Sequence, residues 1–340
     1  MCKQAASSLP RHLPHGFDIA RSLLKERKGV DTDIYPVKPT YGPVDLTGRN
    51  VALIIGGLLL LVLVVLAFTR LSGQAVSLYP IETNGRFGYI NKSGQVSIPP
   101  QFEEADNFSE GYAAVKVGNL WGYIDGKGKF AIAPQFNLAD PFSEGRAMVG
   151  LGPKLGYIDK SGKFAINPQF EGAGEYGDNM APVFVNGRWG YIDRGGKFVI
   201  NPQFDEAGNF CDGMAVVGLN NKFGYIDKSG KLAITPQYVT AGDFHGGRAM
   251  VRSGERFGYI DKAGKMVINP QFDKAGDFSD GAALVAIANR YGYIDKAGRF
   301  LINPQFDEAG DFRSGLAPVW IGGREAYIDK SGKFVWNPTG

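Results

Sequence analysis

The sequence predicts an all-β repeat fold, and three observations support it. From about residue 78 to the C-terminus, the chain repeats every 34 residues without slippage. Each unit contains short apolar segments separated by turn sequences, and the 48 Gly and 19 Pro indicate many turns rather than long helices. A fixed period of this length indicates a solenoid, a propeller or an array. The tyrosine of a "GYI" segment marks the eight units, at Tyr89, Tyr123, Tyr157, Tyr191, Tyr225, Tyr259, Tyr293 and Tyr327.

One unit predicts three strands joined by tight turns. "LAPVW" at 316–320 is a short strand, and turns such as "VNGR" favour a hairpin into the second strand, "GYID". A turn such as "DKSGK" leads to a third strand of the type "FVINP", which we expect to end at its proline. The remaining segment, "QFDEAGDFSEG" in consensus form, is interpreted as a loop or a fourth, outer strand.

Large side chains are predicted on both faces of each sheet. Because side chains alternate along a strand, Trp121 and Tyr123 should face one way and Ile124 the other, while Phe130 and Ile132 should share a face. A sheet of three strands cannot bury two faces alone, so each unit requires neighbours. The glycine before the tyrosine is expected where a neighbouring backbone or ring approaches closely.

The recurring pattern "WGYID…GKF…PQF…AGDFSEG" resembles the bacterial WG-containing repeat family, also called KWG repeats, over residues 78–340. Two copies carry the complete motif, at Trp121, Gly122, Tyr123 and Asp125, and at Trp189, Gly190, Tyr191 and Asp193. Other copies replace the tryptophan with Phe, Leu or Tyr, and the last replaces the Trp-Gly pair with Glu325 and Ala326, which indicates a packing position. The resemblance implies a β-repeat binding scaffold and brings no catalytic residues.

Two architectures satisfy the need for neighbours, a closed β-propeller and an open β-solenoid. Eight units is a reasonable blade number, and the strand order of each unit loosely resembles the blades of quinoprotein propellers. The chain stops after a third strand, as a ring would if the segment before residue 78 supplied the missing outer strand. A 34-residue unit is short beside the ~40–45 residues of a WD40 blade. We favour the propeller and keep the solenoid as the alternative.

Residues 51–69 are predicted to form a transmembrane helix. This segment, from Val51 through Gly56, Gly57 and Phe68, carries no charge over 19 residues. At about 1.5 Å per residue it is long enough to cross the hydrocarbon core of a bilayer. Basic residues concentrate before the span, and the positive-inside rule then places residues 1–50 in the cytoplasm and the repeats in the periplasm of a bacterium.

The first fifty residues are predicted to be a cytoplasmic, Pro-rich tail. Its one helix signal is a short amphipathic segment near 18–28, which would need a membrane surface or a partner to be stable. Residues 70–77 are interpreted as a linker to the repeat domain, residues 78–340.

Candidate chemistry within the repeats is interpreted as structural. The aspartate after "GYI" is typical of a turn that closes with a local Asp hydrogen bond, and the acidic pairs in "FEEA" and "FDEA" are typical of a solvated edge. His12, His15 and His245 do not form a zinc set, Cys211 has no catalytic pattern around it, and no nucleotide-binding or hydrolase motif is found. The aromatic residues could form a sugar-binding stripe if exposed, but core packing is favoured. We therefore predict no catalytic residues, cofactor or metal.

Charge and organisation together predict a membrane-anchored interaction protein. Lys+Arg and Asp+Glu are balanced over residues 70–340, at 29 each, which argues against a nucleic-acid partner. The leading hypothesis is a non-enzymatic scaffold, an accessory subunit of a bacterial inner-membrane complex whose partners are other proteins of that complex and the lipid bilayer. The alternative is an envelope receptor that binds a glycan or another ligand through exposed repeat loops and aromatic side chains.

Overall fold

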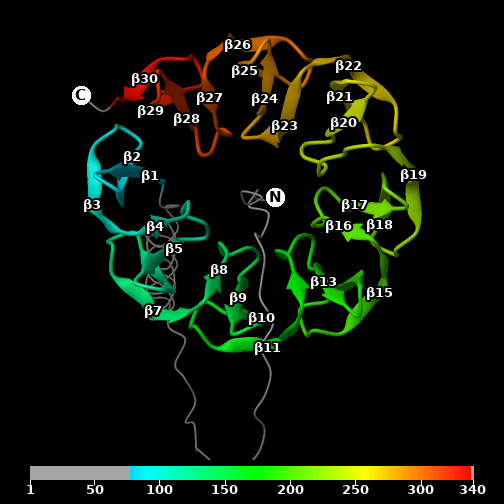
Figure 1. Cartoon of the computed structure of the whole chain (residues 1–340), viewed down its shortest axis with the longest axis horizontal. Helices are drawn as coiled ribbons and strands as arrows, with labels where there is room; N and C mark the ends of the chain where they lie inside the picture. The colour runs from blue at the N-terminus through cyan, green and yellow to red at the C-terminus, as the bar shows by residue number, and fades with distance from the viewer. Residues whose placement is uncertain (1–76, 338–340) are drawn as a thin grey trace, which may run out of the picture. The chain divides into compact units, whose positions relative to one another are not determined.

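The structure, a computed structural model, describes residues 77–337. It places them in eight antiparallel sheets arranged as the blades of a ring, an eight-bladed β-propeller (Figure 1). The predicted propeller is therefore confirmed over the solenoid. No helix long and apolar enough to cross a membrane is found within 77–337. The predicted transmembrane segment 51–69 and the tail lie outside the described residues.

Each blade is built from consecutive strands, numbered here from the centre of the ring outward. The first, innermost strands are β4 (Glu104–Ala105), β8 (Leu138–Ala139), β12 (Gly172–Ala173), β16 (Glu206–Ala207), β23 (Lys274–Ser279) and β27 (Glu308–Ala309). The second strands are β1 (Leu78–Thr83), β5 (Tyr112–Val117), β9 (Ala147–Leu151), β13 (Ala181–Val185), β17 (Met214–Leu219), β20 (Ala249–Ser253), β24 (Ala282–Ile287) and β28 (Leu316–Ile321). The third strands are β2 (Arg86–Asn91), β6 (Leu120–Asp125), β10 (Lys154–Ile158), β14 (Arg188–Ile192), β18 (Lys222–Asp227), β21 (Arg256–Ile260), β25 (Arg290–Ile294) and β29 (Arg324–Asp329). The outermost strands are β3 (Val96–Phe102), β7 (Phe130–Phe136), β11 (Phe164–Phe170), β15 (Phe198–Phe204), β19 (Leu232–Tyr238), β22 (Met266–Phe272), β26 (Phe300–Phe306) and β30 (Phe334–Trp336).

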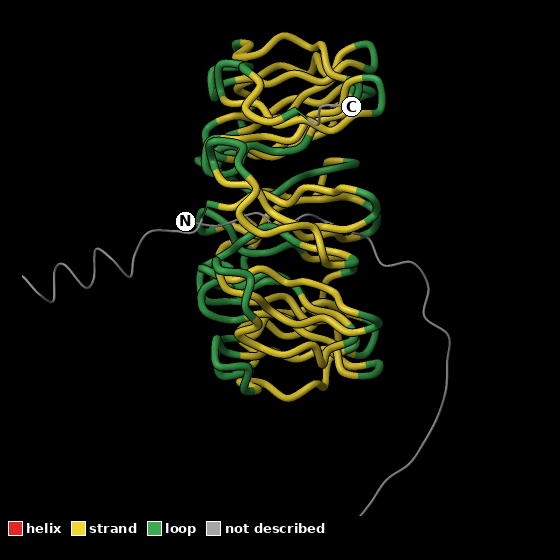
Figure 2. Tube along the Cα trace, turned by 90° about the vertical axis from the view of Figure 1, so that its left-hand side faces the viewer, coloured by secondary structure: helices red, strands yellow, loops and turns green. Residues whose placement is uncertain are grey.

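We number the blades 1 to 8 in chain order, from β1–β3 to β27–β30. Six blades contain four strands, while blades 1 and 6 contain three in the described part of the chain. In the "QFDEAGDFSEG" segment, "QF" ends the outer strand of one blade and "EA" forms the innermost strand of the next, so the expected fourth strand is an inner one and the remainder is largely loop, as the other interpretation had it. The last blade has its own outer strand, β30, and the position without a described strand in blade 1 is the inner one. Figure 2 shows the ring from the side, with loops on its two faces.

The outer strand continues beyond the predicted proline. In blade 2, Trp121 pairs with Phe136 and Tyr123 pairs with Ile132. A step of two positions along β6 therefore corresponds to a step of four positions along β7, which is a β-bulge. This bulge holds the proline at the outer edge, where a missing N–H costs no ladder bond. A Cβ added at Gly122 would lie 2.7 Å from both Ile132 O and Pro134 N. The close approach expected at this glycine is confirmed, and the approaching backbone belongs to the same blade.

The bulge also changes which face the outer-strand residues occupy. Ile132 packs in a cluster with residues of blade 3, whereas the Phe130 ring contacts Phe102 of blade 1 at 6.3 Å between centroids. The expectation that Phe130 and Ile132 share a face was therefore wrong, because regular alternation does not continue through a register shift. In the third strand the predicted alternation holds, with Tyr123 facing blade 3 and Ile124 facing blade 1.

The repeated tyrosine joins each blade to the next. In seven blades its ring is fully buried and its hydroxyl donates to the carbonyl oxygen of the residue 17 positions later, at 2.7–2.9 Å. The acceptor lies on the inner loop of the following blade. In blade 2, Tyr123 also packs against Phe142, with ring centroids 4.9 Å apart. The buried tyrosines therefore pack consecutive blades together, which agrees with the prediction that the aromatic positions of the repeat pack in the core.

In five blades, a carboxylate in the turn before the second strand binds the corresponding turn of the next blade. Glu110 of blade 2 accepts a hydrogen bond from Gly145 N at 2.9 Å and pairs with Lys160 at 3.2 Å, both in blade 3. Glu144, Asp178, Asp212 and Asp280 accept the equivalent backbone hydrogen bond. These carboxylates fix the turns of adjacent blades against each other.

Blades 8 and 1 meet through side-chain contacts. No sheet in residues 77–337 contains strands of both blades. Tyr327 donates to Pro80 O at 2.7 Å, and Tyr79 donates to Ser314 O at 2.9 Å. The two tyrosine rings lie 5.7 Å apart between centroids. The contact between the first and last blades thus uses the same kind of tyrosine bond as the other blade interfaces.

Candidate functional site

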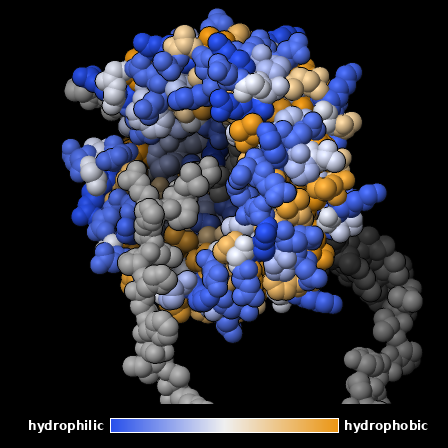
Figure 3. Space-filling model, turned by 45° about the vertical axis from the view of Figure 1, so that its right-hand side comes forward, coloured by the Kyte–Doolittle hydropathy of each residue, from blue (hydrophilic) through white to orange (hydrophobic). Residues whose placement is uncertain are grey.

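The inner loops of the blades carry a row of acidic side chains, which we call the acid ring. These loops include the "AGDF" part of the repeat, which in blade 7 belongs to the inner strand β23. Six of the seven blades whose inner loops are described contribute one acid each: Asp106, Asp140, Glu175, Asp243, Asp277 and Asp311. The space-filling view shows the propeller hollowed at its centre (Figure 3).

Glycines make room for these side chains. A Cβ added at Gly208 of blade 5 would lie 2.7 Å from Asp243 Oδ1 of blade 6. At the next interface, a Cβ at Gly242 would clash with Asp277 Oδ1 of blade 7. At these two interfaces the acid of the following blade lies over the glycine of "AGDF", whereas at Gly276 the Asp311 Oδ1 atom would lie at an ordinary contact distance of 3.6 Å.

Several acids of the ring and one arginine act on each other's pKa across the ring. The Arg313 charge of blade 8 opposes the rise in the pKa of Glu175 in blade 4 and of Asp106 in blade 2, while the Asp243 charge of blade 6 adds to the rise at Glu175. Blades 4 and 8 lie on opposite sides of the ring (Figure 1). Interactions over this separation require side chains that point towards the central hollow.

Burial and mutual repulsion disfavour the charged forms of these acids. Desolvation, with a smaller contribution from the Asp140 carboxylate, raises the pKa of Glu175 to about 8. Desolvation and the Asp106 carboxylate raise the pKa of Asp140 to about 7, and desolvation raises that of Asp106 to about 6. The pKa values of Asp243 and Asp311 are raised by desolvation as well. A cation bound at the centre would restore the charged forms and release protons.

The sequence analysis did not identify the acid ring. The acids of "AGDF" recur at Asp243, Asp277 and Asp311, and this in-phase recurrence was a signal that could have found them. The other members escape a strict motif because Asp106 and Asp140 stand one position earlier, where other units have glycine. Acids of units that are distant in sequence come to face one another only when the ring closes.

The predicted turn role of the other repeated aspartate is confirmed. Asp125 Oδ1 accepts hydrogen bonds from Lys127 N at 2.8 Å and Lys129 N at 3.0 Å, and Asp193 Oδ1 makes the same pair with Gly195 N and Lys197 N. The same two bonds form in every other unit, including the first, where Asn91 replaces Asp. These side chains lie in C-terminal turns of the third strands and do not join the acid ring.

The acidic pairs of "FEEA" and "FDEA" lie on the surface, as predicted. Glu103 pairs with Arg86 at 3.4 Å, and Asp205 pairs with Arg188, with all four side chains 39–51% exposed. Such exposed pairs contribute little to stability.

The tryptophan row is half-buried and packs within the blades. Trp121 joins the cluster between blades 2 and 3, and Lys116 Nζ lies 6.0 Å from its ring centroid. Trp189 packs against Phe184 at 5.4 Å between centroids. Together with the buried Tyr123 and Tyr191, these rings do not form an exposed stripe.

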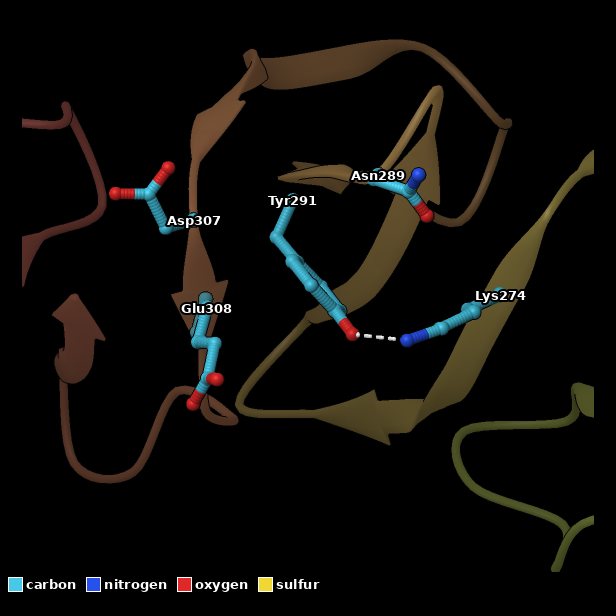
Figure 4. Close-up of a pocket in the computed structure, with 6 residues that line it drawn as sticks. Lys274, Asn289, Tyr291, Asp307 and Glu308 are labelled. Atoms are coloured by element: carbon cyan, nitrogen blue, oxygen red, sulfur yellow. Dashed lines mark hydrogen bonds between the residues drawn. The ribbon is translucent and has the colours of Figure 1, made fainter. Parts of the chain in front are cut away.

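A shallow polar pocket of about 260 Å³ lies between blades 7 and 8 (Figure 4). Lys274 Nζ donates to Tyr291 OH at 2.8 Å, and Asp307 and Glu308 line the other side. Asp307 already pairs with Arg290. The pocket therefore offers mostly satisfied polar groups.

The repeat pattern decides the family. The family model described as "WG containing repeat" matches seven consecutive segments of the chain, residues 87–121, 121–152, 156–189, 189–223, 223–256, 257–290 and 291–324. The chain belongs to the WG-containing repeat family. No curated protein gave a significant match.

Solved structures resemble this WG-repeat propeller in fold. A structure titled "Dihydro-heme d1 dehydrogenase NirN in complex with DHE" matches with a TM-score of 0.52 and 14% identity, covering 77% of this chain and 72% of that one. A structure titled "Crystal structure of the eukaryotic initiation factor" matches with a TM-score of 0.48 and 11% identity, covering 76% and 83%. At these identities the likeness concerns the fold alone.

Proposed function

We propose that this WG-repeat protein is a non-enzymatic interaction scaffold whose acid ring binds a cationic segment of a partner protein. The acid ring carries this proposal, because acids of blades 2, 3, 4 and 6 raise the pKa of Glu175 or are affected by the same arginine across the ring, in a domain whose overall charge is balanced. A basic peptide segment would neutralise carboxyl groups that are costly to ionise alone. Binding would therefore be favoured both by attraction between opposite charges and by weaker repulsion among the carboxylates.

The scaffold is further proposed to be a single-pass protein of a bacterial inner membrane. In this arrangement residues 51–69 cross the bilayer, the tail stays in the cytoplasm, and the propeller serves a membrane complex as an accessory subunit in the periplasm. Support comes from the uncharged segment 51–69 and the basic residues before it. Deleting residues 51–69 should move the protein from the membrane pellet to the soluble fraction. Retention of the deletion variant in the pellet after a high-salt wash would contradict the anchor.

Native co-purification tests the scaffold. The full chain, extracted from its membrane in mild detergent, should retain a stoichiometric protein partner. A ring variant carrying Asp106→Asn, Asp140→Asn and Glu175→Gln should lose that partner, because it removes three acids at the proposed contact. A partner retained unchanged by this variant would refute binding at the ring.

A matched control removes the same number of carboxyl groups elsewhere. The control variant carries Glu103→Gln, Glu171→Gln and Asp205→Asn, which are exposed and paired at the surface. It should keep the partner. Equal loss in both variants would mean that total charge, and not the acid ring, governs the interaction.

The glycan-binding alternative has less support. It requires exposed aromatic faces, whereas the tyrosine row is buried and the tryptophan row is half-buried. The exposed rings include Phe130, Phe164 and Phe300, each at the start of an outer strand.

A further inference from the structure

Blade 6 departs from the repeat at its inner loop. Its described residues form no inner strand, and a single β-bridge between Ala241 and Val251 lies in that position. His245 follows this bridge, at the repeat position where Ser109, Ser143 and Ser279 each donate a hydroxyl to a backbone carbonyl of the next blade. An imidazole at this position cannot reproduce that serine bond in the same way. The loop therefore carries a side chain that the repeat's packing rule does not explain.

His245 lies beside two members of the acid ring. Single ligand atoms of Asp243, His245 and Asp277 all lie within 4.8 Å of one another. Asp243 and His245 come from blade 6 and Asp277 from blade 7, whose inner loops adjoin in the ring (Figure 1). No other trio of His, Cys, Asp or Glu this compact occurs in residues 77–337. The Sγ atom of Cys211 lies 3.3 Å from His245 Nδ1.

The cluster contains polar atoms suited to a ligand. The side chain of His245 is 8% exposed, and imidazole nitrogen is a common zinc ligand. Asp243 Oδ1 is inaccessible to solvent and accepts no hydrogen bond from residues 77–337. A buried carboxylate oxygen without a donor is costly, and a bound cation would remove that cost.

The backbone supports the same geometry. Asp243 N donates to Asp277 Oδ2 at 3.3 Å, which ties the two acidic loops together. Gly242 keeps the space beside Asp277 free of a Cβ. Two ligand atoms on one zinc ion, each about 2.1 Å away, lie about 3.4 Å apart in a tetrahedral site. Small side-chain rotations would close the trio to that spacing.

We propose that Asp243, His245 and Asp277 form a binding site for one divalent transition-metal ion, with Zn²⁺ as its representative. Imidazole favours Zn²⁺ and similar ions over Mg²⁺ and Ca²⁺, while two carboxylates supply the negative charge. Three protein ligands leave one position for water or for a group from a partner. The ion would join blades 6 and 7 at the centre of the ring. The site does not depend on the proposed partner.

Zinc binding to the full chain tests the site. The detergent-purified protein, stripped with a chelator, is titrated with Zn²⁺ by calorimetry. Because His12 and His15 in the tail can also bind Zn²⁺, the result is read as a difference between variants. Asp243→Asn and His245→Ser should each lose one equivalent of Zn²⁺ or bind it at least about tenfold more weakly. His245→Ser restores the residue that other blades carry here, so it is matched to the fold.

Asp311→Asn is the control, since it removes an acid-ring charge outside the trio. It should leave the stoichiometry and the affinity unchanged within about twofold. Equal binding by all four proteins, or equal loss in Asp311→Asn, would overturn the site. If a variant fails to fold, zinc-edge anomalous diffraction from wild-type crystals decides: a peak between the three side chains supports the site, and a peak elsewhere or none refutes it.

Discussion

Replacing Glu175 with glutamine should change how the stability of the propeller depends on pH. Glu175 is 7% exposed, its Oε1 has no hydrogen-bond donor in residues 77–337, and desolvation raises its pKa from 4.5 to about 8. Glutamine keeps the size of the side chain and removes the titration. The variant therefore isolates the cost of placing one carboxyl group in the acid ring.

The sign of the effect follows from proton binding. Between about pH 4.5 and pH 8 the folded protein holds a proton on Glu175, whereas the unfolded chain has released it. The free energy of unfolding of the wild type therefore falls as pH rises through this window. Each pKa unit corresponds to about 1.4 kcal/mol, which sets an upper limit of about 5 kcal/mol for the whole shift. Because buried sites relax, we expect about 2 kcal/mol.

Urea denaturation at about pH 5 and about pH 8.5 measures the difference. All four tryptophans lie between residues 121 and 336, so their fluorescence reports on the propeller. Glu175→Gln should match the wild type near pH 5 and be more stable by about 2 kcal/mol near pH 8.5. The lowered pKa of His245 weakens the fold as pH falls below about 6.5, but it affects both proteins alike and cancels in the difference.

Glu171→Gln is the matched control. Glu171 precedes the same inner strand, is 51% exposed, and pairs with Lys154 at 3.6 Å. Its substitution should change stability by less than about 0.5 kcal/mol at either pH. The reasoning is refuted if Glu175→Gln keeps the full pH dependence of the wild type, or is the less stable protein near pH 8.5.

Three further substitutions in blade 4 test the packing rules, each by urea denaturation. Tyr191→Phe removes the 2.9 Å bond to Gly208 O and should cost about 1–2 kcal/mol; no loss would show that the bond is dispensable. Gly190→Ala places a Cβ 2.6 Å from the backbone of the outer strand and should lower the free energy of unfolding by on the order of 3 kcal/mol. Ala326→Gly at the equivalent position of blade 8 should lower it by at most about 1 kcal/mol, and similar losses for the two variants would contradict the bulge argument. Asp193→Ala should lose about 1 kcal/mol and Asp193→Asn much less, because only alanine lacks the oxygen that accepts the two turn hydrogen bonds; equal losses would contradict that role.

The repeat made most of the fold predictable from sequence. A strict 34-residue period, hairpin turns and the glycine before the tyrosine were local signals, and the strands, the turn aspartates and the buried tyrosines follow them. The position of the fourth strand was not local. Whether "EAGDF" lies inside or outside its blade depends on how blades surround a centre, which no single unit encodes.

Departures from the motif become understandable only with the strand pairing known. Ala326 replaces the motif glycine in blade 8, where the outer strand ends at Trp336 and pairs only with Tyr327 and Ile328. The atoms that crowd the glycine of blade 2 are Ile132 O and Pro134 N, and the proline equivalent to Pro134 in blade 8 lies outside the described residues.

The candidate site was harder to predict because it is assembled from equivalent positions of different units. Asp243 and Asp277 are one repeat apart, as are Cys211 and His245, and the packing of consecutive blades makes such positions neighbours. The histidines were judged by their spacing along the chain, which carries no information about contacts between blades. Comparing the same position across successive units would have found this cluster.

The central claim is that the acid ring binds a cationic segment, and the pH dependence of binding tests it most directly. The probe is a fluorescent lysine-rich peptide, and its affinity for the full chain is measured by anisotropy near pH 6 and near pH 8. Because the pKa values of Asp106, Asp140 and Glu175 are raised to about 6, 7 and 8, the ring gains charge over this range and binding should tighten at least severalfold. The variant with all three acids neutralised should bind weakly at both pH values. Equal affinity of the wild type and this variant near pH 8 would contradict the account.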